Sequence, residues 1–174
     1  MQAANEIYFS DNFFSAGITD IFDKNENKIG KLDLKSAFTS SIDVMDPNGS
    51  IRLYAAFPLF SRRWVLKDKE DERIGELRST FSFFAKRFEY ETEGRGVYRV
   101  ESEAFSHEFT ITEERGNNKI AIFEKISGFM EAPAYKLINY SNVLSNDELI
   151  AVVMGVRMIL KKRRNNSAGP PPGQ

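Results

Sequence analysis

One segment near the C-terminus, residues 145–164, constrains the fold of this chain more than any other. Ser145 and Glu148 fit a capping box, in which a serine and a glutamate three residues later cap the start of a helix. From Leu149 to Leu160 the sequence is apolar and interrupted only by Arg157. Every face of the expected helix is therefore apolar, and such a helix must be surrounded by protein or by lipid.

The length of the apolar stretch decides between these two surroundings. Twelve residues of α-helix span about 18 Å, whereas the hydrocarbon core of a bilayer is roughly 30 Å thick. Charged side chains flank the stretch, with Asp147 and Glu148 before it and the run from Lys161 to Arg164 after it. Because charges are costly to bury in lipid, we expect a helix that is buried inside the protein.

The preceding part of the chain consists of short alternating segments separated by turn residues. One pattern occurs twice: six positions separate Asp23 from Ile29 and also Asp68 from Ile74, and the two copies are 45 residues apart. The same alternation predicts further hairpins, and a final strand, at 42–53, 88–100, 109–123 and 135–140. Ten to twelve short strands at this spacing favour an antiparallel barrel or sandwich.

These two features together predict a mainly β fold with one buried helix, in which the C-terminal helix is threaded through an antiparallel barrel. The length of 174 residues is typical of one domain. We expect that domain to cover residues 1–164, with the closing helix at about 146–164. Residues 165–174, which include three consecutive prolines, are expected to form a disordered tail. The first residues resemble no signal peptide.

Composition excludes several functional classes. The chain has no cysteine, which removes thiolate nucleophiles, Cys-ligated zinc and iron–sulfur clusters. The formal net charge is −1, so a strongly basic nucleic-acid-binding domain is not expected. No phosphate-binding loop, dinucleotide-binding fingerprint or His-Glu-x-x-His motif occurs. We therefore predict no catalytic residue, no metal ligand and no cofactor.

Two features that could carry chemistry have simpler explanations. His107 is the only histidine, and without a cysteine, a second histidine or a nucleophile motif it is expected to be structural. The acidic residues from Asp68 to Glu72 could attract a hard cation, but they lack the glycine and the ligand spacing of a calcium loop. A solvated turn is the expected structure there.

The basic residues at the end of the helix give the strongest functional signal. Residues 149–174 contain five Lys or Arg residues and no Asp or Glu, whereas residues 1–148 contain 19 basic and 25 acidic residues. Four consecutive cations exceed what the helix dipole needs, and they are candidate contacts for an anionic lipid surface: Lys161, Lys162, Arg163 and Arg164.

Weaker candidates are Lys86 and Arg87, which follow a phenylalanine-rich run at 81–84. Aromatic rings beside cations suit a lipid interface or a single-stranded nucleic acid, although alternating phenylalanines also suit the inner face of a strand. Arg62 and Arg63, which precede Trp64, could stack on a ring or contact a phosphate, but they are expected to mark the solvent side of a strand entry.

Several of these segments resemble a known family. Phe13-Phe14-Ser15-Ala16-Gly17 looks like the opening of bacterial LURP-one-related proteins, which are placed in the tubby-like C-terminal superfamily. The hairpin from Arg63 to Gly75 looks like the central tryptophan hairpin of that family, and the terminal apolar helix is similar to its closing helix. The resemblance implies a twelve-stranded barrel around a central hydrophobic helix, but it implies no activity.

Two functions from different classes follow. The leading hypothesis is a non-enzymatic, cytoplasmic binding module that associates peripherally with anionic phospholipid at the inner membrane surface through the basic helix end. The alternative is a protein-interaction or scaffold domain without a lipid role. An enzyme of unrecognised type is the third interpretation, and nucleic acid is not expected as a partner.

Overall fold

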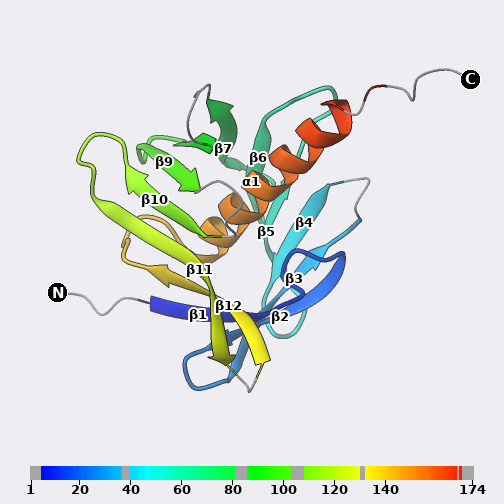
Figure 1. The fold of residues 1–174 in the computed structure, drawn as a ribbon, viewed down its shortest axis with the longest axis vertical. Coiled ribbons are helices and arrows are strands. Elements are labelled where there is room, and N and C mark those ends of the chain that lie inside the picture. Colours follow the sequence, from blue (N-terminus) through cyan, green and yellow to red (C-terminus); the bar gives the residue numbers. More distant parts are fainter. Residues whose placement is uncertain are drawn as a thin grey trace, which may run out of the picture.

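The computed structural model describes residues 5–36, 40–80, 86–102, 108–129, 132–167 and 169 (Figure 1). These residues form twelve strands and one helix: β1 (Asn5–Ser10), β2 (Gly17–Asp23), β3 (Lys28–Leu34), β4 (Ser41–Met45), β5 (Ile51–Ala56), β6 (Trp64–Asp68), β7 (Arg73–Thr80), β8 (Lys86–Thr92), β9 (Val97–Ser102), β10 (Phe109–Glu113), β11 (Lys119–Phe129), β12 (Ala132–Asn139) and α1 (Asn146–Ser167). His107 and the phenylalanine run at 81–84 lie outside the described residues.

The strands form a closed antiparallel barrel. Each strand pairs with its neighbours in the sequence, and β1 pairs with β12 to complete the ring. The predicted fold class is therefore confirmed. The closing strand β1 was not predicted from the sequence, although Ile7 and Phe9 alternate toward the core.

Three hairpins share one turn design, which explains the repeated sequence pattern. In each, an aspartate Oδ1 accepts hydrogen bonds of 2.8–3.0 Å from the backbone N–H groups two and four residues later. The residue three positions after the aspartate has a positive φ. The three aspartates are Asp23, Asp46 and Asp68. The carboxylate of Asp68 therefore serves as a turn cap, as expected for a solvated turn.

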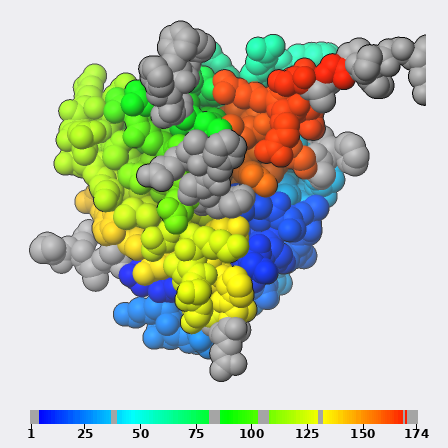
Figure 2. Space-filling model, in the orientation of Figure 1, coloured from blue at the N-terminus to red at the C-terminus, as the bar shows by residue number. Residues whose placement is uncertain are grey.

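Helix α1 fills the barrel with its first half and leaves it with its second (Figure 1). The apolar side chains from Leu149 to Val156 are at most 1% exposed, and Gly155 among them is buried, whereas residues 163–167 are exposed. Figure 2 shows this last part of α1 on the surface. The helix extends to Ser167, three residues past the expected end, so residues 165–167 are helical rather than part of a tail.

Trp64 holds the middle of the helix. Its indole Nε1–H donates a hydrogen bond of 3.0 Å to the carbonyl of Ala151, and its ring lies against Gly155. A Cβ added at Gly155 would be only 2.4 Å from Cδ1 of Trp64. The glycine therefore forms a notch in the helix that the indole ring occupies.

Glu148 holds the start of the helix. Its backbone N–H donates to Ser145 Oγ at 3.1 Å, which is one half of the expected capping box. Its carboxylate, however, is 4% exposed and accepts two hydrogen bonds from the Arg95 guanidinium, at 2.8 and 2.9 Å, and another from the Tyr90 hydroxyl. Burial and the negative charge of Glu148 raise the pKa of Tyr90, which remains a hydroxyl donor.

We expect Gly155→Ala to destabilise the protein by about 2 kcal/mol, because the new methyl group overlaps the Trp64 ring. This expected loss is opposite to the effect of helix propensity, which favours alanine over glycine by roughly 1 kcal/mol. Urea denaturation measures the effect, with Asn165→Ala at an exposed position of the same helix as the control. A more stable Gly155→Ala variant would contradict the notch.

We also expect Arg95→Met to lower the free energy of unfolding by about 3 kcal/mol, because it leaves the buried Glu148 carboxylate without its cation. The double variant Arg95→Met/Glu148→Met should recover most of this loss, since it removes both charges. Denaturation of both variants checks the coupling, and equal stability of the single and double variants would exclude it.

Candidate functional site

The predicted cluster of four cations is divided by the geometry of the helix. Successive residues of an α-helix point about 100° apart, so four neighbours cannot share one face. Lys162 and Arg163 line one cavity, and Lys161 and Arg164 line another. The four side chains therefore line two separate cavities.

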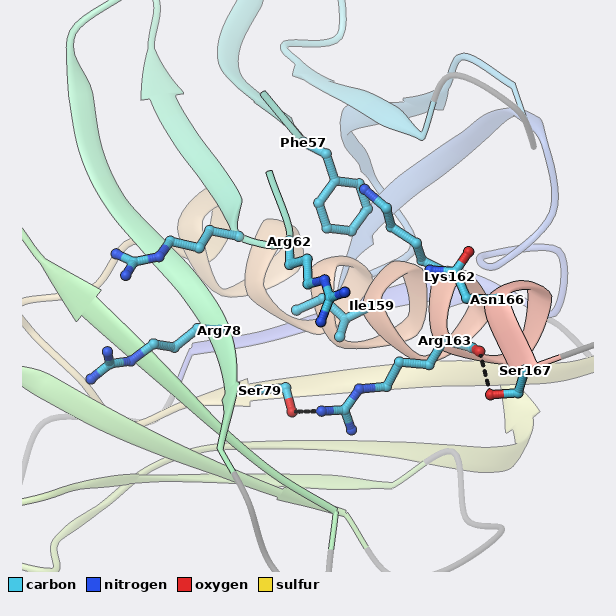
Figure 3. Close-up of a pocket in the computed structure, with 10 residues that line it drawn as sticks. Phe57, Arg62, Arg78, Ser79, Ile159, Lys162, Arg163, Asn166 and Ser167 are labelled. Atoms are coloured by element: carbon cyan, nitrogen blue, oxygen red, sulfur yellow. Dashed lines mark hydrogen bonds between the residues drawn. The ribbon is translucent and has the colours of Figure 1, made fainter. Parts of the chain in front are cut away.

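The larger cavity, which we call the cationic pocket, has a volume of about 620 Å³ and lies where the end of α1 meets β7 and the loop between β5 and β6. Its apolar part is formed by Phe57 and Ile159. It contains five cationic side chains, and Figure 3 shows four of them by label. The full lining is Phe57, Arg62, Arg63, Arg78, Ser79, Ile159, Lys162, Arg163, Asn166 and Ser167.

Two of the five cations are neutralised by carboxylates. Arg63 pairs with Glu76, a residue only 3% exposed that also binds Arg73 at 2.9 Å. Arg78 pairs with Glu89, and its side chain extends away from α1 in Figure 3. These two arginines are paired with carboxylates of β7 and β8, so they contribute little net charge to the pocket.

The other three cations, Arg62, Lys162 and Arg163, have no ion-pair partner among the residues that the structure describes. In Figure 3 they gather around the last turns of α1. A pocket with three uncompensated cations and an apolar side is a favourable site for an anion that carries an apolar portion.

Contacts with neutral groups hold two of these side chains in place. Lys162 Nζ donates a hydrogen bond of 2.8 Å to the carbonyl of Ser61 and lies 4.3 Å from the centre of the Phe57 ring. The Arg163 guanidinium donates to Ser79 Oγ. Neither contact cancels a charge, so the pocket keeps positive charges in defined positions.

Arg62 and Arg63 are exposed directly before β6, which confirms the expected solvent side of a strand entry, but the sequence does not place them among the site residues. The structure places both in the cationic pocket, next to a helix end that is 100 residues later in the chain. The only sequence signal was the arginine pair directly before Trp64. It could not indicate which distant segment the pair would meet.

The remaining predicted candidates lie elsewhere. Lys161 and Arg164 line a cavity of about 150 Å³ with Arg157, whose guanidinium is 5.5 Å from the centre of the Phe14 ring. Lys86 and Arg87 begin β8 and are not part of the cationic pocket; Arg87 pairs with Glu101 at 3.1 Å.

Within the described ranges, no group of three or more His, Asp or Glu side chains could hold a metal ion. No helix in this part of the chain is long and apolar enough to cross a membrane.

The LURP-one-related family matches residues 8–160, which is most of the sequence. The chain belongs to the LURP-one-related family. A search of curated proteins found no match.

Among solved structures, this LURP-one-related chain is similar to that of a protein from Arabidopsis thaliana, with a TM-score of 0.58 and 12% identity. The similarity covers 93% of this chain and 91% of that one. At this identity the likeness supports a shared fold and says nothing about the ligand.

Proposed function

We propose that this LURP-one-related protein is a non-enzymatic, tubby-like binding module whose cationic pocket binds the phosphate headgroup of an anionic phospholipid. The observation that carries the proposal is a group of three cations around one cavity, Arg62, Lys162 and Arg163, which have no carboxylate partner in the described part of the chain. The protein would act peripherally, at the anionic cytoplasmic face of a membrane.

The chemistry of the pocket suits a phosphate ester. Guanidinium groups bind phosphate oxygens through paired N–H donors, and an ammonium group adds a compact charge. Phe57 and Ile159 offer apolar contact to the carbon skeleton of a headgroup. Lys162 is already oriented by its bond to Ser61, which reduces the entropy lost when a ligand binds.

The distribution of charge favours a membrane over a nucleic acid. Residues 1–148 carry 19 basic and 25 acidic side chains, so most of the molecule would repel an extended polyanion. A bilayer, in contrast, needs to approach only the end of the molecule where α1 leaves the barrel. A cationic site there attracts the anionic surface of the bilayer.

Two double variants with equal changes of charge test this proposal. Arg62→Ala/Arg163→Ala removes two cations from the pocket, whereas Lys161→Ala/Arg164→Ala removes two from the same helix end without touching the pocket. In co-sedimentation with phosphatidylcholine vesicles that contain phosphatidylglycerol, we expect the pocket variant to bind roughly thirtyfold more weakly, at about 1 kcal/mol per cation. The control variant should lose much less.

Each possible result has a clear meaning. Equal losses in the two variants would indicate diffuse attraction by the basic helix end and would contradict the pocket. Absence of binding to phosphatidylglycerol vesicles by the unaltered protein would reject the lipid function in favour of a protein-interaction domain. Binding of the unaltered protein should weaken with added salt, because salt screens exposed charges.

A further inference from the structure

The loop between β5 and β6 exposes two large apolar side chains next to the cationic pocket. Leu59 is 85% exposed and Phe60 is 95% exposed, the two highest values among the large hydrophobic residues that the structure describes. They are consecutive in the sequence, so together they form one apolar tip. We call the segment from Pro58 to Ser61 the apolar turn.

The backbone of the apolar turn shows that this exposure is built into the fold. The N–H of Ser61 donates a 2.9 Å hydrogen bond to the carbonyl of Pro58, which closes a four-residue turn. Phe60, the third residue, has a φ of 60°. That conformation favours glycine or asparagine and is unusual for a bulky aromatic residue. A side chain that neither packs nor suits its backbone has no stabilising role in the barrel.

The two ends of the apolar turn are held firmly. On one side, the Phe57 ring packs edge-on against Trp64, with 5.1 Å between ring centres. On the other, Lys162 Nζ binds the carbonyl of Ser61. Contacts on both sides of the apolar turn therefore fix the position of its two ends.

The apolar turn is also bordered by the cations of the pocket. Phe57, which precedes it, and Arg62, which follows it, both line the cavity. Lys162 reaches it from α1. An apolar tip beside phosphate-binding cations matches the cross-section of an anionic bilayer, in which phosphates lie directly above hydrocarbon.

We propose that the apolar turn is a membrane-insertion element: Leu59 and Phe60 enter the hydrocarbon boundary of an anionic bilayer while the cationic pocket holds a headgroup phosphate. This inference rests on the proposed function and adds the depth and orientation of binding. The molecule docks on its β5–β6 end, with the exit of α1 facing the membrane.

A site-specific fluorescent label tests the insertion directly. The chain has no cysteine, so Leu59→Cys accepts a single environment-sensitive fluorophore such as acrylodan. With vesicles of phosphatidylcholine and phosphatidylglycerol, we expect a blue shift of emission, and quenching by lipids spin-labelled on their acyl chains. A matched label at Val143→Cys, a position 48% exposed just before the start of α1, should show neither change.

A substitution at the tip separates insertion from folding. Phe60→Asn removes the ring and suits the positive φ, so we expect a thermal midpoint equal to or above that of the unaltered protein. Its affinity for phosphatidylglycerol vesicles should fall about tenfold, the value of one buried aromatic side chain at a lipid boundary. Unchanged affinity would overturn the insertion.

The outcomes distinguish a failed insertion from a failed lipid site. If vesicles bind with the expected dependence on Arg62 and Arg163 but the label at position 59 does not shift, only the insertion is wrong. If the label shifts with protein concentration in the absence of vesicles, the apolar turn meets a second copy of the chain and the insertion is likewise overturned. If no anionic vesicle binds, both proposals fail.

Discussion

The contact between Trp64 and the helix is the interaction on which the rest of this structure depends. One hydrogen bond to the Ala151 carbonyl and one glycine notch at Gly155 set both the depth and the rotation of α1 inside the barrel. A helix that is apolar on every face has no preferred orientation of its own, since any rotation buries a similar surface. A polar atom at one place on the indole and a missing side chain at one place on the helix, together with the Glu148–Arg95 pair at the helix start, select a single arrangement.

The same tryptophan positions the candidate site. Phe57 packs on Trp64, and Lys162 lies over Phe57, so the contact that orients the buried half of α1 also aligns its exposed end.

The two ends of the helix differ in how their charged side chains are compensated. At the buried start, Glu148 is matched by Arg95 and Tyr90, because an unmatched charge there would be costly. At the exposed end, cations can remain without carboxylate partners because water solvates them, and they stay available to a ligand.

The fold was largely predictable from the sequence, because its signals are local. The hairpin turns at Asp23 and Asp68 are visible as a repeated pattern, and the apolar run after Asp147 indicates a buried helix. The sequence does not predict strand β1, because all six of its residues pair with β12, which is more than 120 residues away. The predicted capping box is confirmed in one half, because Ser145 Oγ caps the helix. The Glu148 carboxylate instead binds Arg95, 53 residues earlier in the chain.

The candidate site was predictable only in part. The sequence places Lys162 and Arg163 at the basic end of the helix, as the structure does. It groups them, however, with Lys161 and Arg164, which line another cavity. The sequence alone determined the turns, the burial of the helix and the location of its basic end, since each follows from residues close together in the chain. Only the tertiary structure decided which cations share a pocket with Arg62, and that an apolar turn lies beside them. Those relations depend on how the closed barrel places β7 and the loop between β5 and β6 next to the end of α1, and no local sequence pattern encodes that proximity.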